Sequence, residues 1–209
     1  MKIEIVSDFK PSKIVCVGRN YAEHAAELGN AVPMEPLLFL KATSALIRNG
    51  ETIVIPEVSS QVEYEGELAV VISKTCKNLA DNANPLDHVL GYACLNDVTA
   101  RDIQRKDVQF TRGKSFDTFC PIGPHIETDL DVSDIRVVTR VNGVIKQDGH
   151  TSQMVFPVDF LIRYISNMMT LYAGDVIATG TPSGVSKMES GDVCEVEIDG
   201  IGILRNTVI

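Results

Sequence analysis

The chain has 209 residues, enough for one well-packed domain, and its 44% hydrophobic and 22% charged residues are ordinary for a globular protein. No apolar run approaches the roughly 20 residues of a membrane-spanning helix, and the acidic N-terminus lacks the apolar core of a signal peptide, so we expect a cytoplasmic protein. The net charge of −9, without a cluster of lysines and arginines, argues against nucleic-acid binding.

The first predicted helix with chemical interest spans about residues 21–28. Asn20 can cap its first turn, with Glu23 reaching back. His24 and Glu27 are three residues apart and therefore share a face of this helix. A carboxylate beside an imidazole orients the ring in the way that a general base requires. A surface ion pair on an exposed helix explains the same local pattern, so both interpretations stay open here.

A strand is predicted at 62–72, where three glutamates precede an apolar run. Because successive side chains of a strand point to opposite faces, Glu63, Glu65 and Glu67 lie on one face. Gly66 lies on the other face and removes bulk where the sheet is closely covered. Carboxylates at the entrance of a buried strand need a metal ion, an arginine or lysine, or water as partner. A solvated edge strand paired with lysine is the alternative.

A second buried strand is predicted at 90–95, and Asp97 follows its end. Functional side chains are often displayed where strands run into loops, although Asp97 can also be a helix cap. If Asp97 converges with Glu65 and Glu67, the three carboxylates supply oxygen ligands. Such hard sites suit Mg²⁺, Mn²⁺ or Ca²⁺ and not the softer metals.

A further helix is predicted to begin near Thr99, because Thr99 and Asp102 have the spacing of a capping box. Arg101 and Gln104 share a face of this helix and can point back toward Asp97. An arginine there is suited to bidentate capture of a carboxylate. The alternative is an ion pair between Asp97 and Arg101 that only stabilises the helix.

Two loops carry further candidates. The tripeptide Gly-Lys-Ser at 113–115 resembles the end of a phosphate-binding loop, but Val108 stands where that loop requires its first glycine. Lys114 is therefore interpreted as a single cation near the site, or as an ordinary surface lysine. The turn Thr-Gly-Thr-Pro-Ser-Gly at 179–184 offers hydroxyl and N–H groups that can bind a carboxylate or an oxyanion.

Turn signals predict the architecture. Asn49-Gly50, Asn142-Gly143 and Asp199-Gly200 each lie between apolar runs, which favours hairpins with type I′ turns. The clearest helix starts at Pro157 and carries an apolar stripe through Met169. We therefore expect one α+β, mainly β domain with a few short helices.

Five motifs, taken in order, resemble the fumarylacetoacetate hydrolase family and in particular its short acylpyruvase-type members. The resemblance runs from about Lys13 to the C-terminus, and the motifs are weak singly but specific together. They are Gly18-Arg19-Asn20-Tyr21-x-x-His24-x-x-Glu27, Tyr64-Glu65-Gly66-Glu67-Leu68, Asn96-Asp97-Val98-Thr99-Ala100-Arg101-Asp102-x-Gln104, Lys114-Ser115-Phe116-Asp117 and Thr179-Gly180-Thr181-Pro182-x-Gly184.

The resemblance implies a single catalytic domain over residues 1–209, with about 1–13 as an N-terminal extension, folded as a mixed β-sandwich roll. It also implies a homodimer and a Mg²⁺ site, with Mn²⁺ or Ca²⁺ as substitutes, on Glu65, Glu67 and Asp97. Glu63 matches no ligand position. Longer relatives have a further aspartate ligand where this chain has Ile14-Val15-Cys16-Val17, so we expect a more open site completed by water.

Residue roles are carried over in the same way. The resemblance implies that His24, Glu27 and Lys114 are catalytic, with the His24–Glu27 dyad on a lid. The residues that it places against a 2-oxo acid substrate are Arg19, Arg101, Gln104 and Thr181.

The activity implied is metal-dependent hydrolysis of a C–C bond in acylpyruvates such as acetylpyruvate or fumarylpyruvate, with pyruvate leaving as an enolate. The same enolate chemistry permits decarboxylation of oxaloacetate. It also permits isomerisation or hydration of unsaturated 2-oxo acids such as 2-hydroxyhepta-2,4-diene-1,7-dioate. A metal-stabilised binding module without catalysis is the non-enzymatic alternative.

Overall fold

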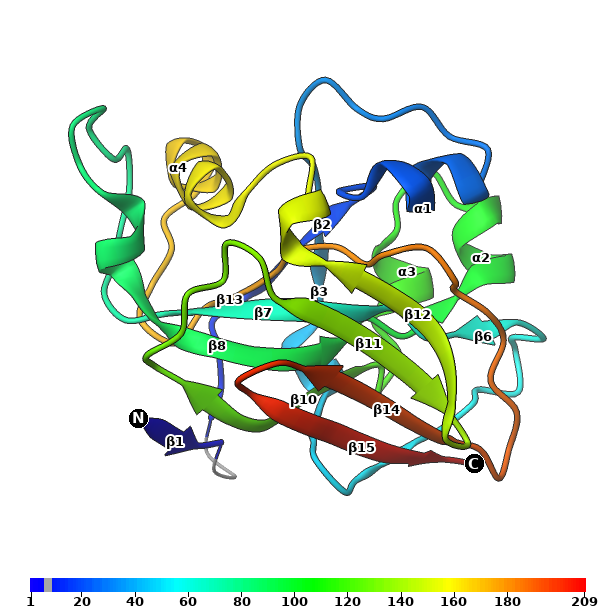
Figure 1. Ribbon diagram of the computed structural model, residues 1–209. Helices are drawn as coiled ribbons and strands as arrows, with labels where there is room; N and C mark the ends of the chain where they lie inside the picture. The colour runs from blue at the N-terminus through cyan, green and yellow to red at the C-terminus, as the bar shows by residue number, and fades with distance from the viewer. Residues whose placement is uncertain (6–8) are drawn as a thin grey trace.

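Two β-sheets packed face to face dominate the fold, which is α+β and mainly β (Figure 1). The computed structural model describes residues 1–5 and 9–209. The larger sheet runs in the order β1 (Lys2–Glu4), β10 (Cys120–Glu127), β8 (Val89–Asn96), β7 (Gly66–Ile72), β13 (Val176–Ala178), β2 (Ile14–Gly18), β3 (Leu37–Lys41), with β4 (Leu46–Arg48) on β10. The second sheet runs β12 (Val144–His150), β11 (Arg136–Val141), β14 (Val193–Ile198), β15 (Gly202–Val208), β5 (Thr52–Ile53).

The central strand β7 is buried on both faces, because it lies between two hydrophobic clusters. Ala69 and Val71 point into one cluster, and Leu68, Val70 and Ile72 point into the other. This alternation is the two-residue period of a strand. The strands β11 and β14 of the second sheet lie against β7, so one cluster fills the space between the sheets.

Helices are short, apart from α4 (Val158–Met168), which confirms the helix predicted from Pro157. Three small helices gather at one end of the sheets, at the upper right of Figure 1: α1 (Ala22–Glu27), α2 (Arg101–Lys106) and α3 (Thr111–Lys114). Three further short elements are 3₁₀-helices: η1 (Thr43–Ala45), η2 (Pro85–His88) and η3 (Thr151–Gln153). In the described part of the chain, no helix is long and apolar enough to cross a membrane.

Two of the three predicted hairpins are confirmed. Asn142 and Gly143, both with positive φ, join β11 to β12, and the turn at Asp199-Gly200 joins β14 to β15. The hairpin predicted at Asn49-Gly50 is wrong. The strands flanking that turn go to different sheets: β4 pairs in parallel with β10, and β5 pairs in parallel with β15. A turn signal fixes the local bend but not the partners of its flanks.

The segment 62–72 is two strands rather than the single predicted one. The short strand β6 (Val62–Glu63) pairs with β9 (Thr99–Ala100), while β7 begins at Gly66 and pairs with β8. The break at Tyr64 and Glu65 places the glutamates where the two ladders diverge.

Both predicted helix caps are also wrong. The side chain of Asn20 bonds to Phe156 and to the Thr179 carbonyl oxygen, and α1 has no side-chain cap. Helix α2 starts at Arg101, also without a side-chain cap, because Thr99 is part of a strand and its hydroxyl donates to the Asp97 carbonyl oxygen. Other hydrogen bonds have taken both side chains: long-range ones for Asn20 and a local one, two residues back, for Thr99.

Gly66 has a close neighbour in the second sheet, which agrees with the expectation of close cover. A Cβ atom at Gly66 would lie 2.0 Å from Thr139 Oγ1. We therefore expect Gly66→Ala to lower the free energy of unfolding by about 1–3 kcal/mol, measured by urea denaturation. Thr139 Oγ1 is buried without a hydrogen-bond partner, so adding Thr139→Ala should relieve the clash at little cost. Equal stability of Gly66→Ala and the wild type would contradict this account.

Candidate active site

The antiparallel pairing of β7 with β8 brings the three predicted ligands together. Gly66 lies opposite Asn96, so the residues just beyond them, Glu65 and Asp97, are neighbours across the ladder. The Asp97 N–H donates to the Glu65 carbonyl oxygen at 2.9 Å, and Asn96 Oδ1 accepts from the Glu65 N–H at 3.0 Å. Glu67 follows on the same face. One carboxylate oxygen from each of Glu65, Glu67 and Asp97 lies within 4.8 Å of the others.

A cavity of about 480 Å³ opens over this acidic cluster, defined as Glu65, Glu67 and Asp97. The cluster itself is at most 5% exposed. The predicted catalytic and substrate-binding residues line the same cavity as Glu65 and Glu67: Arg19, His24, Glu27, Arg101, Gln104, Lys114 and Thr181. The structure thus gathers residues that are spread from position 19 to position 181 of the sequence, and their roles stay predictions.

Two buried lysines hold the acidic cluster. Lys114 Nζ donates to Glu65 at 2.9 Å, to Asp97 at 2.7 Å and to Thr99 Oγ1 at 2.8 Å. Lys41 Nζ donates to the other Asp97 oxygen at 2.6 Å and to the Val98 carbonyl oxygen. Since all three N–H donors of Lys114 are used, its position supports a role in holding the ligands.

Sequence reasoning missed Lys41. Its only signal is a charged residue at the end of an apolar strand, Leu-Leu-Phe-Leu-Lys, where a fully buried lysine needs a partner. The partner, Asp97, is 56 residues away in the chain.

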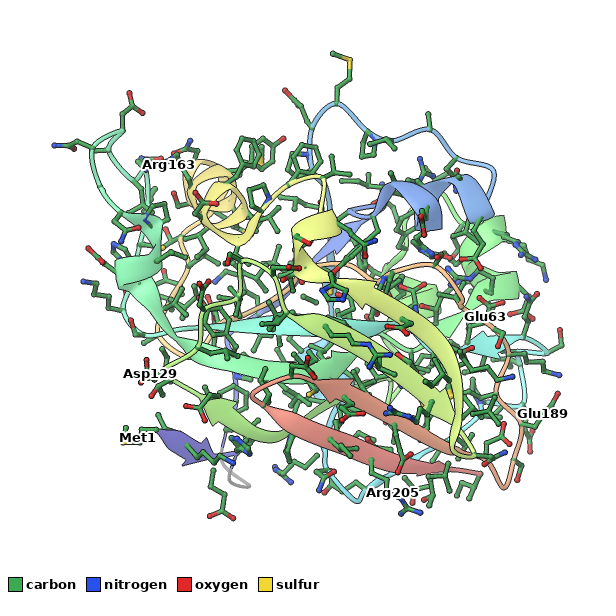
Figure 2. All side chains as sticks on the ribbon, viewed as in Figure 1. Met1, Glu63, Asp129, Arg163, Glu189 and Arg205 are labelled. Carbon is green, nitrogen blue, oxygen red and sulfur yellow. The ribbon has the colours of Figure 1, made fainter. Side chains whose placement is uncertain are left out.

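Arg101 pairs with two glutamates and not with Asp97. Its Nε donates to Glu63 at 2.7 Å, its Nη2 donates to Glu65, and its Nη1 donates to Gln104 at 2.6 Å. Glu63, which matches no ligand position, is therefore the buried counterion that fixes Arg101. Figure 2 labels Glu63 close to α2, the helix that begins with Arg101.

The turn at 179–184 binds a carboxylate, as its N–H groups suggest, but the carboxylate belongs to the protein. The Gly180 N–H donates to Glu67 at 2.8 Å, and the Thr181 hydroxyl donates to the Gly66 carbonyl oxygen at 2.8 Å. Gly180 has φ +98°, and an added Cβ would lie 2.8 Å from the Asn20 Cβ. Only glycine fits such a left-handed, crowded position.

The charges around the cavity do not balance. Four buried carboxylates, Glu63 and the acidic cluster, face three buried cations, Lys41, Arg101 and Lys114. Burial opposes ionisation of Glu65, but the charges of Lys114 and Arg101 outweigh it and hold its pKa well below the ordinary value. Burial, together with the charges of Asp97 and Glu65, raises the pKa of Glu67 well above its ordinary value. Ionisation is therefore disfavoured at Glu67, where the buried cations do not offset the cost of burial and the neighbouring negative charges.

The donor set fits a hard divalent cation. All three candidate ligands are carboxylates, close enough to share one ion, and a bound cation would supply the positive charge that the ionised form of Glu67 needs. The segment 14–17, where a further aspartate ligand is expected in longer relatives, has no acidic residue and reaches the cavity through Val17, so water would complete the shell. Glu65, Glu67 and Asp97 are the residues that would hold the ion.

The His24–Glu27 pair lies on α1 across the cavity from the acidic cluster. His24 Nδ1 is 3.4 Å from Glu27 Oε2, and the His24 side chain is only 6% exposed. Glu27 also accepts from the Gly184 N–H at 3.1 and 3.2 Å. With Nδ1 facing Glu27, the other ring nitrogen of His24 is available to a substrate in the cavity.

Arg19 differs from the other arginines of the described chain. Each of those has a hydrogen-bond or ion-pair partner, whereas Arg19 has none within residues 1–5 and 9–209. It follows the end of β2 with φ +59°, a left-handed conformation that is costly for a side chain other than glycine. A strained backbone here presents an unpaired guanidinium to the cavity.

Comparison with known proteins agrees with this geometry. Residues 13–209 match the family model described as the C-terminal part of fumarylacetoacetate hydrolase. An uncharacterized protein of Methanocaldococcus jannaschii is 54% identical, over 97% of this chain and 85% of its own length. The oxaloacetate tautomerase YisK of Bacillus subtilis is 45% identical, over 95% and 70%. The crystal structure of 5-carboxymethyl-2-hydroxymuconate delta-isomerase from Mycobacterium smegmatis is 46% identical, with a TM-score of 0.89 over 95% of this chain and 79% of its own.

The raised pKa of Glu67 predicts a pH-dependent cation affinity. A cation binds the ionised carboxylate, so binding must displace the proton that Glu67 holds below its raised pKa. We expect Mg²⁺ affinity to rise with pH and binding to release a proton, measured by calorimetry in buffers of different ionisation enthalpy. Glu67→Gln should weaken binding at least about tenfold and abolish the proton release. Glu195→Gln, on β14 away from the cavity, is the matched control, and an unchanged affinity in Glu67→Gln would refute the site.

Proposed function

The chain belongs to the fumarylacetoacetate hydrolase family, and from its acidic cavity we propose a divalent-metal-dependent tautomerase that interconverts the keto and enol forms of a 2-oxo dicarboxylic acid such as oxaloacetate. One observation carries the proposal: the His24–Glu27 pair and the three carboxylates of the acidic cluster line or underlie one cavity. A base opposite a cation site is what enolisation of a 2-oxo acid needs. The names of relatives at this level of identity support the same chemistry.

The proton moves within the substrate. His24, oriented by Glu27, takes a proton from the carbon next to the keto group, and the electron pair of that C–H bond moves to the oxygen as an enolate. Returning the proton to that oxygen gives the enol, so atoms and charge balance. The bound metal would supply Lewis-acid stabilisation of the negative oxygen. Lys114 adds positive charge beside the carboxylates of Glu65 and Asp97, and Arg101 adds positive charge beside Glu65.

Arg19 supports a dicarboxylic substrate. The donors of Lys114 are all taken by protein oxygens, and each of the three guanidinium nitrogens of Arg101 already bonds to Glu63, Glu65 or Gln104, so both side chains are held by protein groups. Arg19 lines the cavity and has no hydrogen-bond or ion-pair partner among the residues that the structure describes. A guanidinium matches the geometry of a carboxylate in a bidentate pair. We assign it the carboxylate distal to the 2-oxo acid group.

Hydrolysis of acylpyruvates is the second candidate. The observation that favours it is again the His24–Glu27 pair, because a base that can accept a proton from carbon can also accept one from water. Water would then attack the distal carbonyl carbon, the C–C bond would break, and pyruvate would leave as its enolate. The two candidates differ in products and not in the residues that they need.

A single panel of assays separates the candidates. Purified protein with Mg²⁺, Mn²⁺ or EDTA is given oxaloacetate, acetylpyruvate or fumarylpyruvate, and both loss of enol absorbance and release of pyruvate are followed. We expect metal-dependent tautomerisation of oxaloacetate without release of pyruvate. His24→Ala should slow it about 10²–10⁴-fold, whereas His125→Ala, on β10 outside the cavity, should not.

Release of pyruvate from an acylpyruvate would instead select the hydrolase, and its release from oxaloacetate would indicate a decarboxylase. No metal-dependent change in any of the three compounds would overturn both candidates.

Arg19→Gln tests the dicarboxylic substrate. Losing hydrogen bonds to a charged group should raise KM for oxaloacetate about 10–100-fold. Inhibition by oxalate, which lacks the distal carboxylate, should stay within about twofold because it uses only the metal side of the cavity. Arg105→Gln is the control, since Arg105 lines the cavity but is already bonded to Gln61. If Arg19→Gln weakened inhibition by oxalate as much as it raised KM for oxaloacetate, the assignment would be contradicted.

A further inference from the structure

The loop 183–186 crosses close to the catalytic pair and has few ties to the sheets. On its N-terminal side, Thr181 is bonded to Gly66 and to Gln147. On its C-terminal side, the Met188 N–H donates to the Val62 carbonyl oxygen at 2.8 Å. Next to these anchors, the Pro182 carbonyl oxygen accepts from Gln147, and Lys187 forms a β-bridge with Glu63. The side-chain hydrogen bonds that the described chain gives residues 183–186 go to α1 and to Tyr64.

Tyr64 reaches this loop from between two site residues. Its neighbours Glu63 and Glu65 both bond to Arg101, while its own fully buried side chain points to the other side of the segment. The Tyr64 hydroxyl donates to the Gly184 carbonyl oxygen at 2.8 Å and lies 2.6 Å from Ser186 Oγ. The tripeptide Glu63-Tyr64-Glu65 thus contacts Arg101 with one side and the loop 183–186 with the other.

Gly184 carries the contact onward to the catalytic pair. Its N–H donates to both oxygens of Glu27, whose Oε2 is 3.4 Å from His24 Nδ1. Gly184 has φ +104°, and an added Cβ would lie 2.1 Å from the Lys146 carbonyl oxygen. The backbone at Gly184 is therefore narrowly confined. The Gly184 carbonyl oxygen accepts from Tyr64, and the Gly184 N–H donates to Glu27.

We infer that Tyr64 is a positioning residue for the His24–Glu27 pair, acting through the Gly184 peptide. Its side chain does not line the cavity. Its hydroxyl fixes the loop that presents the Gly184 N–H to Glu27, and Glu27 in turn fixes the imidazole. This inference rests on the proposed role of His24 as base. It adds Tyr64 as the residue that fixes the position of this base relative to the candidate metal ligands.

The test is Tyr64→Phe, which keeps the buried ring and removes only the hydroxyl. We expect kcat for the 2-oxo acid substrate to fall about tenfold, since the Gly184 carbonyl loses a buried partner, while KM and Mg²⁺ affinity stay within about twofold. In a Glu27→Ala background, Tyr64→Phe should cause no further loss, because a residue acting only through the Glu27 carboxylate has nothing left to position. Ser186→Ala, which leaves the Tyr64–Gly184 bond intact, is the matched control and should stay within about twofold of the wild type.

A second readout does not need turnover. Amide exchange at Gly184, followed by NMR, should speed up about tenfold in both Tyr64→Phe and Glu27→Ala, because each removes one of its hydrogen-bond partners. Unchanged exchange in Tyr64→Phe, or additive losses of kcat in the double variant, would overturn the inference. If the wild type turns over no 2-oxo acid, the proposed function fails, and the exchange measurement still decides whether Tyr64 holds the loop against Glu27.

Discussion

The site depends on a buried electrostatic arrangement in which carboxylates outnumber cations by one. Dehydrating a carboxylate is costly unless a cation accompanies it. Lys41 and Lys114 pair with Asp97, and Arg101 and Lys114 pair with Glu65. Within the described residues, Glu67 has only the Gly180 N–H as a hydrogen-bond donor, and burial together with the charges of Asp97 and Glu65 raises its pKa. The protein thus builds most of a cation site from its own charges and leaves the last charge to be neutralised by a ligand.

The fold makes this arrangement by placing the ends of strands together. The ligands emerge where β6 and β7 diverge and where β8 ends, and the small helices at the same end of the sheets supply Arg101, Lys114 and the His24–Glu27 pair. The second sheet packs so closely behind the ligand strand that only glycine fits at position 66. Close packing behind the strand leaves the cavity side as the open one, and the predicted site residues lie on this side.

Much of this was predictable from local patterns, and the rest was not. The two-residue period placed Glu63, Glu65 and Glu67 together, and turn residues located two hairpins. The flanks of Asn49-Gly50, the partner of Lys41 and the contact of Tyr64 with Gly184 each depend on residues distant in sequence. Asn20 failed as a cap for the same reason, because a tertiary partner competed successfully for its side chain. Period and turn chemistry describe neighbours in the chain, whereas the site is made by neighbours in space.

The most direct test of this account is where a divalent cation sits. Crystals grown with Mn²⁺ would show its position by anomalous scattering, independently of any assay. The account predicts one strong peak bounded by Glu65, Glu67 and Asp97, with an oxygen of each carboxylate within about 2.0–2.3 Å of the ion and water completing the shell. An absent peak, or a peak held by other residues while the lysine pairs of Asp97 stay unchanged, would contradict it.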